Sequence, residues 1–458
     1  MENNINNNTE KKLALFNVKP IFNEELPETN NLGPEEKAAV MRVMDTGVLS
    51  AFVAKFDPRF YGGVEVKKFE KTFQDMFKVK HAVSCNSATT ALQMAVAAAG
   101  IGPGDEVITS PYTMSATPSA VLMNQGIPIF ADIDPDTFCI DPADVERKIT
   151  PRTKAVLSVN IFGHMPDYDR LRQICDKYNL ILIEDCAQSP LAHYNGKYTG
   201  TVGDIGVFSF NFHKTMHCGE GGVLTTNNDK FALRAQLMRN HGEVVVDFME
   251  ENDPRRNEII LGNNFRLSEL HAAIATEQLK KINHLTEKRV ELAEYLTRKL
   301  KAIPGITTPL VRNGSSHVYY LYAMKFDANI WGISRNTFIK ALRAEGAPVA
   351  QGYVKPLYLI PMYQNKQVYN ESHYPFDSKY YDGNPDYSKG SCPVVEEMFE
   401  KTLFTTNICR YPLTTVHMDL FISAIQKVWD NKEQLKALDL RNEQKNESMA
   451  AITSHFRY

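Results

Sequence analysis

The chain has 458 residues, which is more than one hydrophobic core usually fills, so we expect two domains. Apolar residues make up 43% of the sequence and charged residues 23%, proportions typical of a globular protein. Lysine and arginine total 51 against 54 aspartates and glutamates, and the net charge of -3 argues against nucleic acid or a membrane surface as a partner.

No run of 18 apolar residues occurs, so the sequence predicts no membrane span. The seven cysteines are scattered, and no pair has C-x-x-C spacing. We therefore expect no disulfide framework and no metal site, and a reducing, cytoplasmic location. The asparagine-rich start, MENNINNNTEKKLALF, has no apolar segment of the kind found in signal peptides.

Apolar runs alternate with helical patterns from residue 81 onward. The predicted strands cover 81–86, 106–111, 127–133, 155–163 and 180–185, and the predicted helices between them cover 88–100, 115–126, 143–149 and 167–179. This alternation predicts an α/β fold with a mostly parallel sheet covered on both faces by helices. Two further strands, 206–212 and 221–227, follow closely on each other.

A long helical pattern from Ser268 to Lys301 predicts a bridge to a second, smaller α+β domain. That domain contains a predicted strand at 317–326, helices at 334–346 and 417–438, and a long loop at 364–391. We therefore divide the chain into a partly disordered N-terminal arm at 1–30, a large domain at 31–285, a small C-terminal domain at 286–440 and a polar tail at 441–458.

Ligands of an open α/β sheet bind beyond the carboxyl ends of its strands, so residues that follow each apolar run are candidates. Ser87, Ala88 and Thr89 follow the first strand and begin a helix. The free N–H groups and partial positive charge of a helix N-terminus suit a phosphate. A plain helix cap by Ser87 or Thr89 is the alternative interpretation.

Asp185 ends the apolar run LILIE. A carboxylate there needs a cation or strong hydrogen-bond donors, because burial of a lone charge is costly. A protonated pyridine nitrogen meets that need, and the charge pair keeps the ring protonated as an electron sink. Gln188, one turn further, is placed to touch a phenolic oxygen of the same ligand. The alternatives for Asp185 are a helix N-cap and a magnesium ligand.

Lys214 lies between two apolar strands in FSFNFHKTMHCGEGG. A lysine among apolar and small residues is desolvated, which lowers its pKa and frees the amine for imine formation. Ser209 offers a hydroxyl to a phosphate, and the three glycines at 219, 221 and 222 allow tight turns near a ligand. The alternative, a solvated surface lysine, fits these neighbours poorly.

Asn264 and Arg266 stand just before the long helix in GNNFRLSELHAA. They form a fourth candidate segment, and the alternative is a helix cap by Ser268 with solvated neighbours.

Together, these four segments resemble the DegT/DnrJ/EryC1/StrS aminotransferases, fold-type I enzymes that use pyridoxal 5'-phosphate (PLP) and act mainly on keto sugars. The resemblance runs from about Gly33 to Asp430 and rests on the order and spacing of its markers. These are NSATTAL, GIGPGDEVI, DIDPDTFCIDP, ITPRTKAV, FG, LILIEDCAQ, GDIGVFSF, HKTMHCGEGG, RNHGE and GNNFRLSELHAAIATEQL.

The resemblance implies that Lys214 is the Schiff-base lysine and general acid/base, and that Asp185 pairs with the ring nitrogen. It implies that Gln188 contacts the ring face or phenolic oxygen. Asn264 looks like a phosphate ligand supplied by the neighbouring subunit, so a homodimer with two shared active sites is implied. Ala88, Thr89 and Ser209 look like the phosphate cup of the family, and Ser87 is a further cofactor-binding residue that the resemblance implies.

Two residues depart from the family pattern. Ala88 replaces the usual glycine of the cup, and alanine is small enough to leave the amide donors accessible. Met114 stands where the family usually has an aromatic residue on the cofactor ring; a thioether can cover a π-face, and Tyr112 is close by. The segments 244–260 and 364–391 also differ in length from many relatives, and we expect them to shape the substrate mouth.

The implied reaction moves an amino group from glutamate or glutamine to a keto sugar for surface polysaccharide or secondary metabolite biosynthesis. A nucleotide-linked keto-deoxyhexose is the first expectation for the acceptor; a free keto sugar such as an octulosonate and a keto-inositol stay open. The candidate substrate contacts, for which ordinary surface or dimer contacts are the alternative, are Tyr61, Gly62, His241, Arg266, His317 and Tyr353.

Two rival functions remain. Some relatives are PLP-dependent sugar dehydratases in which a histidine replaces the lysine, but Lys214 is present here, and His213 and His217 are out of register. The other rival is a non-catalytic regulator that binds PLP or nucleic acid. The basic helical segment LKKINHLTEKRVELAEYLTRKLK suggests it, but its mixed charges at helical spacing favour a solvated face.

Overall fold

A computed structural model describes residues 12–446 of the chain, with side chains to residue 439. The predicted arm and the predicted polar tail therefore fall partly outside the described residues. Within the described range, no helix combines the length and the apolar character that crossing a membrane requires.

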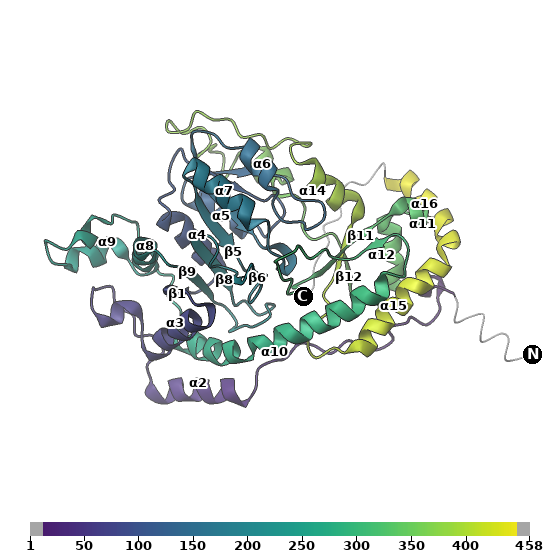
Figure 1. The fold of residues 1–458 in the computed structure, drawn as a ribbon, viewed down its shortest axis with the longest axis horizontal. Coiled ribbons are helices and arrows are strands. Elements are labelled where there is room, and N and C mark those ends of the chain that lie inside the picture. The colour runs from purple at the N-terminus through teal and green to yellow at the C-terminus, as the bar shows by residue number, and fades with distance from the viewer. Residues whose placement is uncertain (1–11, 447–458) are drawn as a thin grey trace, which may run out of the picture.

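A seven-stranded sheet forms the centre of the large domain, in the order β1-β9-β8-β5-β4-β2-β3 (Figure 1). All neighbouring pairs from β8 to β3 are parallel, and only β9 runs against its two neighbours. The predicted mostly parallel α/β sheet is therefore confirmed. The strands are β1 (His81–Cys85), β2 (Glu106–Thr109), β3 (Ile127–Phe130), β4 (Thr153–Val159), β5 (Ile181–Asp185), β8 (Ile205–Ser209) and β9 (Gly222–Thr226).

Alternate residues of each strand point to opposite faces of this sheet, and helices cover both faces. Ile183 and Val207 pack with α4 and α8 on one face, whereas Leu182 and Phe208 belong to clusters on the other face, with α7 and with α3. The helices of this domain are α2 (Pro34–Thr46), α3 (Val64–Phe77), α4 (Ala88–Ala98), α5 (Ala116–Met123), α6 (Pro142–Arg147), α7 (Tyr168–Tyr178), α8 (Asp229–Arg239) and α9 (Gly242–Val245).

The bridge between the domains is α10 (Glu269–Leu300), a 32-residue helix that runs along both of them (Figure 1). Ile282 packs in the core beneath α3, whereas Leu292 and Leu300 pack in the core of the second domain. One helix thus fixes the two domains relative to each other.

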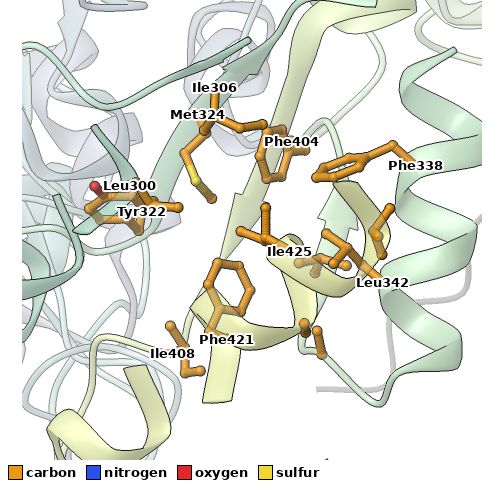
Figure 2. Packing of buried hydrophobic residues seen from close by; sticks show 14 of the residues in the cluster. Leu300, Ile306, Tyr322, Met324, Phe338, Leu342, Phe404, Ile408, Phe421 and Ile425 are labelled. Carbon is orange, nitrogen blue, oxygen red and sulfur yellow. The ribbon is translucent and has the colours of Figure 1, made fainter. Parts of the chain in front are cut away.

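The second domain is built on a four-stranded antiparallel sheet in the order β10-β11-β13-β12. Figure 2 shows its core, where Met324 and Phe404 of the sheet face Phe338 and Leu342 of α12 and Ile425 of α15. Its elements are β10 (Ile306–Thr307), β11 (Tyr322–Phe326), α11 (Ala328–Trp331), α12 (Arg335–Ala344), β12 (Val349–Gln351), β13 (Leu403–Thr406), α15 (Thr415–Asp430) and α16 (Lys432–Asn446). Between β12 and β13 the chain forms α13 (Pro361–Gln364) and α14 (Pro393–Glu397), which pack with Phe130 of β3 in the large domain.

The N-terminal segment packs on the second domain. Leu13 and Phe22 are buried in its core, and the Glu345 carboxylate accepts hydrogen bonds from the backbone N–H of Ala14 (2.7 Å) and Ile21 (3.1 Å). At least residues 13–22 of the predicted arm are therefore ordered. At the other end, α16 extends into the predicted polar tail.

Three elements depart most from their predicted bounds. The strand predicted at 155–163 stops at Val159, because Phe162 and Gly163 adopt positive φ angles of 58° and 96°. The strand predicted at 317–326 begins only at Tyr322, after Tyr319 with φ 49°. The helix predicted at 417–438 is two helices, α15 and α16, which meet at Asn431.

Candidate active site

The candidate residues gather at the carboxyl edge of the large sheet. Asp185 is the last residue of β5 and Ser209 the last residue of β8, and these two strands are parallel neighbours. The loop that carries Lys214 begins directly after β8, and the turn that carries Ser87 follows β1. Topology therefore brings together segments that are far apart in the sequence.

Asp185 is a buried carboxylate held by two donors. Its Oδ2 accepts a hydrogen bond from the Thr117 hydroxyl at 2.9 Å, and its Oδ1 accepts one from the Ala187 N–H at 3.1 Å. Burial raises the pKa of Asp185, while these donors and the charge of Lys214 oppose the shift. The site is thus built to hold an anion that needs a cationic partner.

The Lys214 amine faces the same carboxylate. Burial lowers its pKa to about 8, and the Asp185 charge opposes that shift, so the structure brings the two groups together. The lowered pKa increases the share of neutral amine near neutral pH. A neutral amine is the form that attacks a carbonyl carbon.

Distant segments anchor the Lys214 loop. The Gln278 side chain of α10 accepts a hydrogen bond from the His217 N–H at 3.5 Å and donates one to the Asn31 carbonyl at 3.1 Å. Asn31 in turn donates to the Thr215 carbonyl at 3.4 Å. Residues next to Lys214 are therefore tied to both the bridging helix and the N-terminal segment.

The turn before α4 provides a cradle of backbone amides. The Ser87 hydroxyl caps the helix by accepting from the Thr90 N–H. The amides of Ala88 and Thr89 belong to the first turn, so they have no acceptor within the helix. A Cβ atom on Gly222 would lie 2.5 Å from the Ser87 carbonyl and 2.7 Å from the Ala88 nitrogen. Only glycine lets β9 approach the cradle this closely.

Gln188 is buried in a network that joins the two domains. Its Oε1 accepts a hydrogen bond from the Phe162 N–H at 2.7 Å, and its Nε2 donates to the Tyr353 hydroxyl at 3.1 Å. The Tyr112 hydroxyl accepts from the Tyr353 N–H at 2.7 Å, and the three aromatic rings contact one another edge to face. Tyr353 is therefore brought to the site through Gln188.

Met114 lies in the turn before α5, three residues from the Thr117 that binds Asp185. Its side chain is 58% exposed, in contrast to the fully buried Tyr112. The Met114 carbonyl accepts a hydrogen bond from the Thr117 N–H at 3.1 Å. Met114 is thus joined through its backbone to the residue that binds Asp185, and its thioether side chain is exposed.

Asn264, Arg266 and His241 form one cluster. The Arg266 guanidinium donates to Asn264 Oδ1 at 2.7 Å and lies 3.3 Å from His241 Nε2. The neighbouring Phe265 carbonyl accepts from the Asn86 N–H at 2.9 Å, which ties this segment to the turn before α4. These three predicted residues are thus brought together, with Asn264 exposed.

Three predicted substrate contacts are not brought to Lys214 within one chain. Tyr61 lines a cavity with His81, which begins β1 at the sheet edge opposite Asp185, and Gly62 packs against Phe52 and Val66. His317 is buried: its ring stacks on Tyr319 at 4.1 Å, and its Nδ1 accepts from the Tyr319 N–H. The imidazole is therefore part of the packing, and its role as a substrate contact stays a prediction.

Two further residues of the site, Thr117 and Tyr320, were not predicted from the sequence. Thr117 donates to the Asp185 carboxylate from α5, a helix whose sequence contains no motif that predicts a functional site. Tyr320 places its ring under the Lys214 amine, with 4.6 Å between Nζ and the ring centroid. Neither contact is encoded in a local motif, because each joins residues from different segments.

Comparison with known proteins places this arrangement in a family. The model of the DegT/DnrJ/EryC1/StrS aminotransferase family matches residues 53–401. The chain belongs to this family. It is accordingly a PLP-dependent aminotransferase of fold type I, as the sequence motifs predicted.

Relatives of the DegT/DnrJ/EryC1/StrS family match most of the chain. The spore coat polysaccharide biosynthesis protein SpsC of Bacillus subtilis is 34% identical over 353 residues, 76% of this chain and 88% of the relative. GDP-perosamine synthase of Caulobacter vibrioides is 35% identical over 335 residues, with coverages of 72% and 85%. The L-glutamine:2-deoxy-scyllo-inosose aminotransferase of Streptomyces kanamyceticus is 36% identical over 315 residues, with coverages of 66% and 72%.

A solved structure of the family has the same fold. S. venezuelae DesV, solved in complex with a ketimine intermediate, superimposes with a TM-score of 0.71 and 29% identity and covers 87% of this chain and 94% of its own. Family members use PLP, and the residues present here fit that group. A buried carboxylate suits its ring nitrogen, a partly neutral amine suits its aldehyde, and the amide cradle at Ala88 suits its phosphate.

The close approach of Gly222 to the cradle gives a testable consequence. In a Gly222→Ala variant the new Cβ must push the Ser87–Ala88 peptide away, so we expect weaker PLP retention and a loss of about 1–3 kcal/mol of stability. Equilibrium dialysis and urea unfolding measure the two effects. Gly102→Ala is the matched control, since no atom lies within 4 Å of its added Cβ. Equal PLP affinity in the two variants would contradict the assignment of the cradle.

Proposed function

We propose that this aminotransferase moves an amino group from glutamate or glutamine to a keto sugar, most readily a nucleotide-linked keto-deoxyhexose, in surface polysaccharide or secondary metabolite biosynthesis. The observation that carries the proposal is the buried Asp185–Lys214 pair beside the amide cradle of α4. The relatives' names support the substrate class, since one is a GDP-perosamine synthase and another acts in coat polysaccharide biosynthesis.

In this proposal each group of the site holds one part of PLP. Asp185 pairs with the ring nitrogen, Lys214 binds the aldehyde carbon, and the amides of Ala88 and Thr89 with the Ser209 hydroxyl hold the phosphate. Gln188 contacts the ring face or the phenolic oxygen, and Met114 covers the ring with its thioether. When bound, PLP supplies an electron sink for the carbon next to the transferred nitrogen.

Lys214 is the proposed acid/base of the transfer. Lys214 would hold the aldehyde group of PLP, and its amine would serve as the base that takes a proton from the donor's α-carbon and as the acid that gives the proton back during the transfer. Its lowered pKa, about 8, suits this role, because an amine that is partly neutral near neutral pH can both accept and donate the proton.

A second copy of the chain is proposed to complete the site. Asn264 is exposed in one chain, and the nearby Ile259 and Leu261 are 90% and 76% exposed. Large apolar side chains so exposed are favourable sites for burial against another surface. We therefore propose a homodimer in which Asn264 reaches the partner's phosphate cup, and in which Tyr61, Gly62 and segment 244–260 line the partner's substrate mouth.

The sugar would meet Arg266, His241 and Tyr353 around the mouth. Arg266 carries a fixed positive charge suited to the phosphates of a nucleotide-linked sugar. A keto-inositol acceptor is the second candidate, favoured by the 36% identity to a 2-deoxy-scyllo-inosose aminotransferase whose name also specifies L-glutamine as donor. Segment 364–391 stays a proposed contributor to the mouth.

A donor and acceptor screen tests the proposal. We expect glutamate or glutamine to change the visible spectrum of the PLP-loaded protein, and a nucleotide-linked keto-deoxyhexose to reverse the change and appear as its amine in mass spectrometry. A keto-inositol and a keto-octulosonate are the comparison acceptors. Loss of water from the sugar without gain of nitrogen would indicate a dehydratase, and a spectrum that no donor changes would indicate a regulator.

A further inference from the structure

The face of the Tyr320 ring lies against the Lys214 amine. The Nζ atom is 4.6 Å from the ring centroid, which is within the range of a cation–π contact. Three titratable groups lie around this amine: Asp185 at the end of β5, the Tyr320 ring, and His213 in its own loop, whose pKa is lowered by burial and by the Lys214 charge. Tyr320 belongs to the stretch that enters the second domain, just before β11.

The backbone that carries Tyr320 is tightly held. The buried guanidinium of Arg289, from α10, donates to the carbonyls of both Tyr319 (3.2 Å) and Tyr320 (3.1 Å). On the other side, the Gly163 carbonyl accepts from the Val318 N–H at 2.9 Å, and a Cβ on Gly163 would lie 2.9 Å from the Tyr320 nitrogen. The bridging helix and the large domain thus clamp this stretch from two sides.

The same stretch contains a strained residue. Tyr319 has φ 49°, in the left-handed region that residues with a Cβ seldom adopt. Such conformations persist only where the surroundings over-determine them, and they gather at functional sites. Here the turn at Tyr319 delays the start of β11 to Tyr322 and directs the side chain of Tyr320 toward Lys214.

We propose that Tyr320 is a positioning residue that holds the Lys214 amine through the face of its ring and favours the protonated form of that amine. The proposal rests on the proposed role of Lys214 as the acid/base. An amine that carries a proton between two carbon atoms must stay in place while it is a cation, and the ring face attracts a cation without accepting its proton. Asp185 stabilises the same cation in a different way, through the negative charge of its carboxylate.

The pKa of Lys214 in the cofactor-free protein tests this proposal. Limited acetylation across a pH series, read by mass spectrometry of each lysine peptide, gives the pKa of Lys214 without any turnover. We expect Tyr320→Leu to lower that pKa by about one unit, a tenfold change in the protonation ratio, because the ring's attraction is lost. Tyr320→Phe and Tyr320→Trp keep a ring face and are expected to stay within about 0.3 units of the parent.

Each outcome decides the proposal. The exposed Lys177 on α7 is an internal control whose pKa must not change in any variant. If Tyr320→Leu leaves the pKa of Lys214 unchanged, or if Tyr320→Phe lowers it as much as leucine does, the ring face has no such role. If Tyr320→Leu does not fold, the phenylalanine and tryptophan variants still decide between ring and hydroxyl. Failure of the parent protein to attach PLP at Lys214, by contrast, would overturn the proposed function and not this contact.

Discussion

Replacement of Lys214 by alanine is expected to abolish transamination while leaving the protein folded. The side chain supplies both the proposed covalent attachment of PLP and the proposed acid/base, and loss of an acid/base alone costs about 10²–10⁴-fold. The combined loss is expected to be about 10⁴-fold or more in kcat/KM. The fold is expected to persist, because the removed amine has an unfavourable environment that lowers its pKa to about 8.

Steady-state rates with the best donor and acceptor measure this effect, and circular dichroism with thermal unfolding checks the fold. Lys177→Ala is the control variant: Lys177 is an exposed lysine paired with Glu146, and a surface pair of this kind contributes about 0–1 kcal/mol. We expect its activity to equal that of the parent. Appreciable transamination by Lys214→Ala would show that another group carries the reaction.

Asp185→Asn is expected to lower kcat/KM by about 10²–10⁴-fold. Asparagine keeps the shape, and its single oxygen can still accept from the Ala187 N–H, but its NH2 group cannot accept from the Thr117 hydroxyl and the negative charge that faces the ring nitrogen is lost. Loss of one partner of a buried ion pair costs about 3–5 kcal/mol, which corresponds to this range. Because the Asp185 charge also raises the pKa of Lys214, that pKa is expected to fall below about 8 in the variant.

The kinetic measurement should be paired with Thr117→Val, which removes one hydrogen bond but keeps the charge. We expect Thr117→Val to lower kcat/KM by about 10–150-fold, since a hydrogen bond to a charged group contributes about 1.5–3 kcal/mol. Near-normal activity of Asp185→Asn, or an equal loss in both variants, would argue against a charge pair with the cofactor ring.

Much of the large domain was predictable from the sequence. Its strands read as continuous apolar runs because both sheet faces are buried, as the opposite packing of Leu182 and Ile183 shows. The same burial made Asp185 stand out, since a carboxylate that ends such a run requires a partner. Lys214 stood out for the same reason, as a charge between two buried strands.

The second domain was less predictable. Its strands β12 and β13 have only three and four residues, too few for a period-two pattern to be distinguished. The positive φ of Tyr319 shortened the strand predicted at 317–326, and tyrosine does not mark a turn as glycine or proline would. Phe162 shortened the strand predicted at 155–163 of the large domain in the same way. Burial of Leu13 in this domain was hidden within a polar segment.

Contacts between segments account for the rest of the site. Thr117, Tyr320 and the Gln188–Tyr353 pair act through side chains that the fold brings together from different elements, and no spacing rule connects them. The packing of His317 against Tyr319 was hidden for a related reason, because no sequence signature separates a packed histidine from a substrate contact.

The covalent attachment of PLP to Lys214 is the central claim, and borohydride reduction of the PLP-loaded protein tests it most directly. Reduction followed by protease digestion and mass spectrometry is expected to place a phosphopyridoxyl group on the peptide that contains Lys214, and glutamate added before reduction is expected to prevent this labelling. Label on a different lysine, or a protein that takes up PLP without any reducible bond, would contradict the account.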